Sequence, residues 1–178
     1  MKTKFLIISA FLFNIVFTFS SCEKTGPLVI DENATEFSKS ADESTITVTD
    51  KGQGVGNYTF TSDKTWILNG LVFVNKNQTL TIEAGALIKG KPGTNENASA
   101  LIVARGGKIN AVGTATAPIV FTAEADNYEG TTVAKEVQGL WGGIIILGNA
   151  TTNNPNTDKA IEGAMAVPIL AKGTKLMG

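Results

Sequence analysis

The chain has 178 residues, of which 43% are hydrophobic, and a formal net charge of −1. This length and apolar content suffice for one domain with a core, and the near-neutral charge excludes the basic surface that nucleic-acid binding requires. Histidine is absent and there is one cysteine, Cys22, which excludes Ser–His and Cys–His nucleophile systems and the usual zinc sites. We expect no cofactor and no metal site, and carboxylate, lysine and arginine side chains remain for any chemistry.

The N-terminal segment, residues 1–22, has the pattern of an export signal. Two lysines in Met1–Lys4 precede the apolar run Phe5–Phe19, which is shorter than the roughly 20 residues of a membrane span. Cys22 follows directly, and Phe19-Ser20-Ser21-Cys22 resembles the lipobox of bacterial lipoproteins, although Phe19 and Ser21 depart from its usual residues. The resemblance implies lipid attachment at Cys22 and a membrane-anchored protein of the cell envelope, in the outer membrane or at the cell surface. The alternative is an ordinary signal peptide followed by an unmodified thiol.

Residues 23–57 are predicted to be a tether with one strand. Glu23–Ser44 is polar and shows no sustained alternation, which is typical of a linker. Thr45–Thr49 alternates between polar and apolar residues and predicts a strand, and the glycines of Lys51–Asn57 predict a turn.

From residue 58 onward the chain is rich in short apolar and β-branched runs separated by turns, which indicates an all-β domain. The predicted strands lie in YTFTS, TWILNG, LVFV, TLTIEAG, ALIKG, ALIVARG, GKINAVG, PIVFTAEA and LWGGIIILGNA.

Two stretches, Thr79–Gly90 and Ala100–Ala111, share one pattern, and the second begins about 21 residues after the first. Such a period predicts a solenoid, and short strands joined by glycine corners favour a parallel β-helix of about 21 residues per coil. Leu80 is then expected to stack under Leu101, and Ile88 under Ile109. An antiparallel sandwich is the alternative, but it does not explain the matching glycine and isoleucine positions.

The spacing also gives an expectation for the end of the repeat region. The interval from Ile102 to Ile144 is twice this period, and it includes the acidic segment Glu124–Gln138, which is predicted to be a loop at one corner.

The phrases WILNGLVFV, LTIEAGALIKG, ALIVARGGKINAVGTA, PIVFTAEAD and LWGGIIILGNA, from Trp66 to Ala150, resemble a family of exported lipoproteins from Bacteroidetes. This resemblance implies a pectate-lyase-like, right-handed parallel β-helix over residues 58–178, in a family mostly of unassigned function. The match fades after Gly163, and Ala164–Gly178 contains no coil phrase. Because a solenoid needs a terminal cap, we expect the helix to be truncated at its C-terminus.

The candidate ligand-binding residues are Glu124, Asp126, Tyr128 and Trp141. If the preceding strand continues, Glu124 and Asp126 share one face, where two carboxylates could hold Ca²⁺ or flank a glycosidic bond. The alternative is a solvated acidic loop. Trp66 and Trp141 could stack on sugars, or they could close apolar strands, which we favour for Trp66.

Glu83 and Arg105 are charges beside strands, and their separation exceeds the period by a single position, which predicts that they lie nearly one above the other. A surface ion pair is the simpler interpretation, and an arginine as used by polysaccharide lyases is the other.

These features predict a lipid-anchored β-helix that binds polymer, such as a polysaccharide, or has a structural or adhesive role, and no catalytic residue is identified. A polysaccharide lyase or glycoside hydrolase fragment is the alternative, and a secreted structural fragment without an anchor is a third.

Overall fold

The structure is a computed structural model that describes residues 34–134 and 136–148. Cys22, the export signal, the first part of the expected tether and the tail from residue 149 lie outside the described residues. Within the described ranges, no helix is both long and apolar enough to cross a membrane.

The described part consists of short strands and one 3-10 turn. In chain order these are β1 (Glu36–Lys39), β2 (Thr45–Thr49), β3 (Tyr58–Phe60), β4 (Thr65–Leu68), β5 (Leu71–Val74), β6 (Thr79–Ile82), β7 (Leu87–Gly90), η1 (Asn95–Asn97), β8 (Ala100–Val103), β9 (Lys108–Ala111), β10 (Val120–Ala123) and β11 (Ile144–Ile146).

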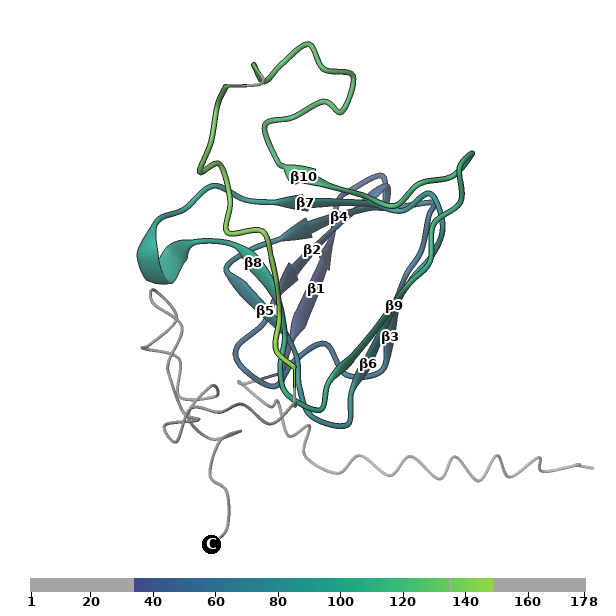
Figure 1. Cartoon of the computed structure of the whole chain (residues 1–178), viewed down its shortest axis with the longest axis vertical. Helices are drawn as coiled ribbons and strands as arrows, with labels where there is room; N and C mark the ends of the chain where they lie inside the picture. The colour runs from purple at the N-terminus through teal and green to yellow at the C-terminus, as the bar shows by residue number, and fades with distance from the viewer. Residues whose placement is uncertain (1–33, 135, 149–178) are drawn as a thin grey trace, which may run out of the picture. The chain divides into compact units, whose positions relative to one another are not determined.

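The strands form three sheets that are the sides of a triangle when viewed down the solenoid axis (Figure 1). Sheet A has the order β1-β2-β4-β7-β10, sheet B the order β3-β6-β9, and sheet C the order β11-β8-β5. Every neighbouring pair is parallel except β1 and β2. Each coil adds one strand to each sheet, so the predicted all-β parallel β-helix is confirmed and the antiparallel sandwich is excluded.

The predicted stacking columns, however, are wrong. Leu80 lies in sheet B between Tyr58 and Ile109, whereas Leu101 lies in sheet C between Val72 and Ile144. Ile88 likewise pairs with Trp66 and Phe121 in sheet A and not with Ile109.

The two similar stretches are successive corners of the solenoid, not the same corner of successive coils. The first is β6, a turn at Gly85 and β7; the second is β8, a turn at Gly106 and β9. Both glycines have positive φ, 85° and 83°, a conformation that glycine adopts without a steric penalty. Both stretches form a tight turn between two short strands. They therefore share one sequence pattern although they lie on different sides of the triangle.

Coil length also varies more than a uniform repeat allows. The interval from Tyr58 to its register partner Leu80 is close to the predicted period, and the interval from Leu80 to its next partner, Ile109, is clearly longer. The interval from Leu101 to its partner Ile144 is longer still, and it is a single coil that includes the acidic segment. The segment Glu124–Gln138, predicted to be a loop, contains no strand among its described residues.

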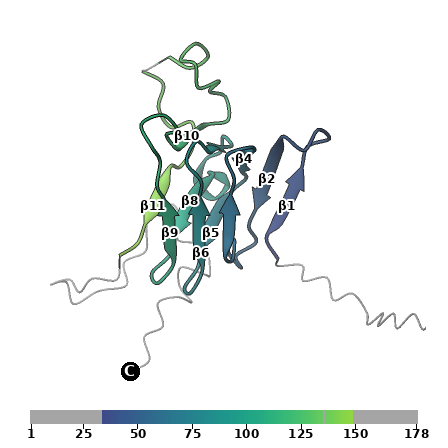
Figure 2. The ribbon, with the colours of Figure 1, turned by 90° about the vertical axis from the view of Figure 1, so that its right-hand side faces the viewer.

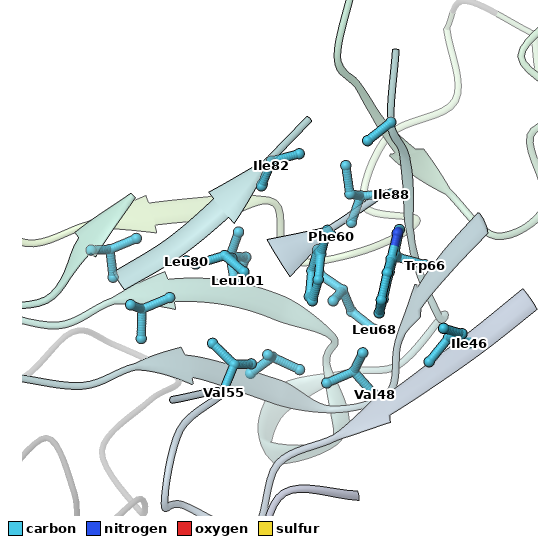
Figure 3. Close-up of a cluster of buried hydrophobic side chains, with 14 residues drawn as sticks. Ile46, Val48, Val55, Phe60, Trp66, Leu68, Leu80, Ile82, Ile88 and Leu101 are labelled. Carbon is cyan, nitrogen blue, oxygen red and sulfur yellow. The ribbon is translucent and has the colours of Figure 1, made fainter. Parts of the chain in front are cut away.

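The interior of the triangle is filled by alternate residues from all three sheets (Figure 3). Phe60 and Trp66 stack with ring centroids 4.3 Å apart, and the Trp66 Nε1 donates a hydrogen bond to the Thr61 carbonyl oxygen at 2.9 Å. Because Trp66 is only 2% exposed, the expectation that it packs in the core is confirmed.

Sheet C is apolar on both faces, which its continuous runs LVFV, ALIV and III indicate. The residues of sheet C that face the interior include Val72, Val74, Leu101 and Val103. On the opposite face, Phe73, Ala100 and Ile102 form a second buried cluster, against which Leu71, Ile145 and Leu147 pack.

The N-terminal end of the β-helix is closed by an antiparallel hairpin, β1 and β2 (Figure 2). Strand β1 was not predicted, because its sequence EFSK lies within the polar stretch expected to be a tether. Phe37 of β1 stacks on Tyr58 with ring centroids 4.3 Å apart, and the outer strand carries the charges of Glu36 and Lys39. Charges on an edge strand oppose further pairing, so this hairpin is a cap.

Asp50 closes the same end of sheet C. Its Oδ2 accepts a hydrogen bond of 2.8 Å from the backbone N–H of Phe73, on the outermost strand β5. Its Oδ1 accepts from the N–H groups of Gly52 and Gly54 at 2.7 and 3.0 Å, which shapes the predicted turn after β2. The Asp50 carboxylate therefore accepts hydrogen bonds both from the edge of a strand and from a glycine turn.

Candidate functional site

The predicted ligand-binding residues all lie on the connection from β10 in sheet A to β11 in sheet C. Glu124, Asp126 and Tyr128 come in its first turn, and Trp141 comes near its end. We call Glu124–Thr132 the acidic turn.

Asp126 fastens the acidic turn to the outer face of sheet A. Its Oδ2 accepts a hydrogen bond of 2.5 Å from the Thr122 Oγ1, and its Oδ1 accepts one of 3.0 Å from the Tyr128 N–H. The Lys89 Nζ donates to the Asp126 carbonyl oxygen at 2.6 Å. Lys89 and Thr122 are register partners on β7 and β10, so the parallel ladder itself brings both anchors to Asp126.

These contacts favour the charged form of the carboxylate. The hydrogen bond from Thr122 contributes most to lowering the pKa of Asp126 below its ordinary value, followed by the Tyr128 N–H, with a smaller contribution from the Lys89 charge. Asp126 is therefore an acceptor at neutral pH, with one oxygen bound to a threonine and the other to the backbone.

Glu124 and Asp126 do not share a strand face. That expectation required β10 to continue, but the strand ends at Ala123 and the Asp126 N–H turns back to donate to the Ala123 carbonyl oxygen at 3.0 Å. Glu124 consequently points its exposed side chain into solvent while Asp126 returns to the sheet.

Asn127 holds the acidic turn in a compact shape. Its N–H donates to the Thr132 Oγ1 at 2.8 Å and its Nδ2 to the Thr131 Oγ1 at 2.6 Å. Its Oδ1 accepts from the Glu129 N–H at 3.1 Å. Tyr128, at φ 69° and 56% exposed, is thus presented from a braced turn.

Trp141 lies in a different environment from Tyr128. It is partly buried, packs against the interior core, and lies over Gly90 of β7 so closely that a side chain at Gly90 would overlap the indole ring. The structure thus groups Glu124, Asp126 and Tyr128 in one turn and uses Trp141 for packing of the last described coil. Ligand binding by any of the four stays a prediction.

The predicted stacking of Glu83 with Arg105 is wrong. Glu83 follows β6 at the corner to β7, where its Oε2 accepts hydrogen bonds from the Ser62 N–H at 2.8 Å and the Ser62 Oγ at 3.3 Å. Arg105 lies at the next corner, between β8 and β9. The cause is the shift by one side of the triangle described above.

The side chains that shape the site, which are those of Lys89, Thr122 and Asn127, were not predicted from the sequence. Thr122 lies one strand length before Asp126 and could have been noticed, but Lys89 is brought there only by the register of β7 with β10. In the described part of the chain, no group of three or more His, Cys, Asp or Glu side chains could hold a metal ion.

Comparison with known families identifies this scaffold. The model of the pectate-lyase like beta helix domain matches residues 52–167, which include β3 to β11 and the acidic turn. The chain belongs to this family. No curated protein and no solved structure gives a significant match. Family membership agrees with the pectate-lyase-like β-helix that the resemblance implied, while export and lipid attachment stay predictions.

Proposed function

We propose that this protein is a lipid-anchored, non-catalytic β-helix of the bacterial cell envelope that binds polysaccharide through its acidic turn. The observation that supports this most directly is the presentation of Tyr128. It is a large aromatic residue, 56% exposed, on a turn whose backbone is held by side-chain hydrogen bonds.

An exposed aromatic ring on an ordered turn is suited to binding a sugar. The apolar face of a pyranose can pack on the tyrosine ring, and little conformational entropy is lost because the turn is already ordered. The neighbouring Glu124 and Glu129 side chains are exposed and can accept hydrogen bonds from sugar hydroxyls.

The charge of the region selects among polysaccharides. Residues 124–138 contain the carboxylates of Glu124, Asp126, Glu129 and Glu136 against the single lysine at position 135. This negative balance disfavours polyuronates and other acidic polymers. We therefore expect a neutral, hydroxyl-rich polysaccharide.

Binding is tested by retention of the full chain on insoluble neutral polysaccharides and on a polyuronate. We expect retention on a neutral polymer, a loss of at least about tenfold in affinity for Tyr128→Ala, and no loss for Val137→Ala, an apolar residue of the same connection that is 49% exposed. No retention on any polymer, or equal retention of the Tyr128 variant, contradicts the proposal.

The same panel distinguishes the enzymatic alternative. New reducing ends or an unsaturated product, lost on Glu124→Ala or Arg105→Ala, would support a lyase or hydrolase in place of a binding protein.

The anchor is tested separately by labelling cells with a palmitate analogue. Label is expected on the wild-type protein and not on Cys22→Ala, and an unlabelled wild type would end the claim of lipid attachment.

A further inference from the structure

A chemically labile dipeptide lies at the corner where β4 of sheet A leads to β5 of sheet C. This dipeptide, Asn69-Gly70, is the one place in the sequence where asparagine is followed by glycine. In such a pair the backbone nitrogen of the glycine can attack the side-chain amide carbon of the asparagine, because glycine has no side chain to obstruct the approach. The corner therefore carries the residues that spontaneous deamidation needs.

The fold itself requires glycine at this corner. Gly70 has φ 79°, a conformation that glycine adopts without a steric penalty, and a Cβ there would meet no atom within 4 Å. The backbone conformation, and not a lack of space, thus selects the glycine. Asn69 is fixed as well, since its N–H donates to the Val48 carbonyl oxygen at 2.9 Å and its Nδ2 to the Thr49 Oγ1 at 3.1 Å.

The next coil holds both backbone polar groups of Gly70. Its N–H, which carries the attacking nitrogen, donates to the Ser99 Oγ at 3.0 Å, and its carbonyl oxygen accepts from the Ala100 N–H at 3.2 Å. Ser99 is only 1% exposed, so its hydroxyl is held in place. Attack requires the Gly70 nitrogen to lose its proton and to turn toward the Asn69 amide carbon, and the hydrogen bond to Ser99 opposes both.

We propose that Asn69-Gly70 is a deamidation site that the Ser99 hydroxyl keeps unreactive while β8 is in place. When β8 detaches, hydroxide removes the Gly70 amide proton and the nitrogen bonds to the Asn69 Cγ. The Cγ–Nδ2 bond then breaks, ammonia leaves with a proton taken from water, and a succinimide ring remains. Water opens this ring at either of its two carbonyl carbons. The products are aspartate at position 69 and isoaspartate, in which the main chain runs through the side-chain carbon.

Isoaspartate changes the length of the corner. The corner between β4 and β5 consists only of Asn69 and Gly70, so an extra main-chain carbon displaces β5 relative to its partner β8. The modification therefore marks a chain whose β8 has opened, and it hinders that chain from closing again.

The proposal is tested on the full chain at mildly alkaline pH, by peptide mapping that resolves asparagine, aspartate and isoaspartate at position 69. We expect the folded wild type to deamidate far more slowly than the same chain in urea. Ser99→Ala is expected to accelerate deamidation of the folded protein about tenfold, the factor that corresponds to the loss of one hydrogen bond. Asn69→Gln in the Ser99→Ala background should abolish the signal, because the larger ring that glutamine would form closes slowly.

Two further variants separate this local effect from a general loss of stability. Ile82→Val shortens a side chain of sheet B that is 2% exposed and makes none of the hydrogen bonds at the corner, so its rate should equal that of the wild type. Ser99→Cys keeps the shape of the serine but is a weak acceptor, and it replaces Ser99→Ala if that variant does not fold. Equal rates for the wild type and the Ser99 variant, or an equal acceleration in Ile82→Val, overturn the proposal. A folded wild type that deamidates as fast as the chain in urea overturns it too.

Discussion

The indole of Trp141 occupies the space that Gly90 leaves by having no side chain. Gly90 lies in sheet A beside Leu68, in a column whose members Val48 and Leu68 belong to the interior core. A Cβ at Gly90 would overlap the ring of Trp141 and stand 2.9 Å from its Cβ. The tryptophan near the end of the long connection is thus fitted to one glycine of the preceding coil.

Gly90→Ala is expected to destabilise the protein by about 1–3 kcal/mol, because the added methyl forces the indole out of its position. Thermal unfolding measures the loss. Gly148→Ala is the control, since a Cβ there would meet no atom within 4 Å. A Gly90→Ala protein as stable as the control would contradict the packing of Trp141.

Asp50→Ala is expected to cost about 2–4 kcal/mol, because the backbone N–H groups of Gly52, Gly54 and Phe73 lose their acceptor. Hydrogen exchange should quicken at the Phe73 amide before it does in β8. Asp63→Ala, which removes an exposed carboxylate that lies 3.3 Å from the Lys64 ammonium, is the control and should leave the stability close to that of the wild type. Unchanged exchange at Phe73 would argue against the role of Asp50.

Acid should loosen the N-terminal hairpin through Asp42. Hydrogen bonds from Ser40 and Ser44 lower the pKa of Asp42 from 3.8 to about 2. Because the folded pKa is depressed, the stabilisation is present above pH 3.8 and is lost as the pH falls toward 2. Carboxyl carbon chemical shifts in an NMR titration should report a pKa of about 2, and Ser40→Ala should raise it. A value near 3.8 in the wild type would refute the hydrogen-bonded turn.

Phe37→Ala is expected to cost about 1–3 kcal/mol by removing the stack on Tyr58 that holds β1 over the end of the core. Denaturant unfolding measures it, with Val137→Ala, 49% exposed, as the control that should be near neutral. If both variants have the same midpoint as the wild type, β1 does not act as a cap.

The strands were predictable because each is a short alternating or continuous apolar run bounded by glycine or polar turns, and β2 to β11 all lie within the predicted segments. Strand β1 was not, because EFSK has one apolar residue and owes its pairing to β2 and the contact of Phe37. The register could not be predicted from a local repeat, because corners on different sides of the triangle need the same residues.

The candidate site was predictable only as a segment. An acidic, tyrosine-containing loop after a strand was recognisable from PIVFTAEADNYEG. Its geometry depends on Lys89, which lies on the preceding coil and reaches the Asp126 carbonyl oxygen. Lys89 lies beside β10 only because of the register between the two coils. This register depends on coil length, which differs from one coil of this β-helix to the next, so the contact could not be predicted from the sequence.

The aromatic cluster at the N-terminal end of the β-helix has a consequence for the order of folding. Phe37, Tyr58, Phe60 and Trp66 form a chain of ring contacts and lie early in the described chain. Each later strand of sheets A, B and C adds to one already made. A chain that emerges amino end first from a ribosome or a translocation channel can therefore complete its template before the rest appears, and assemble strand by strand without waiting for its last residue.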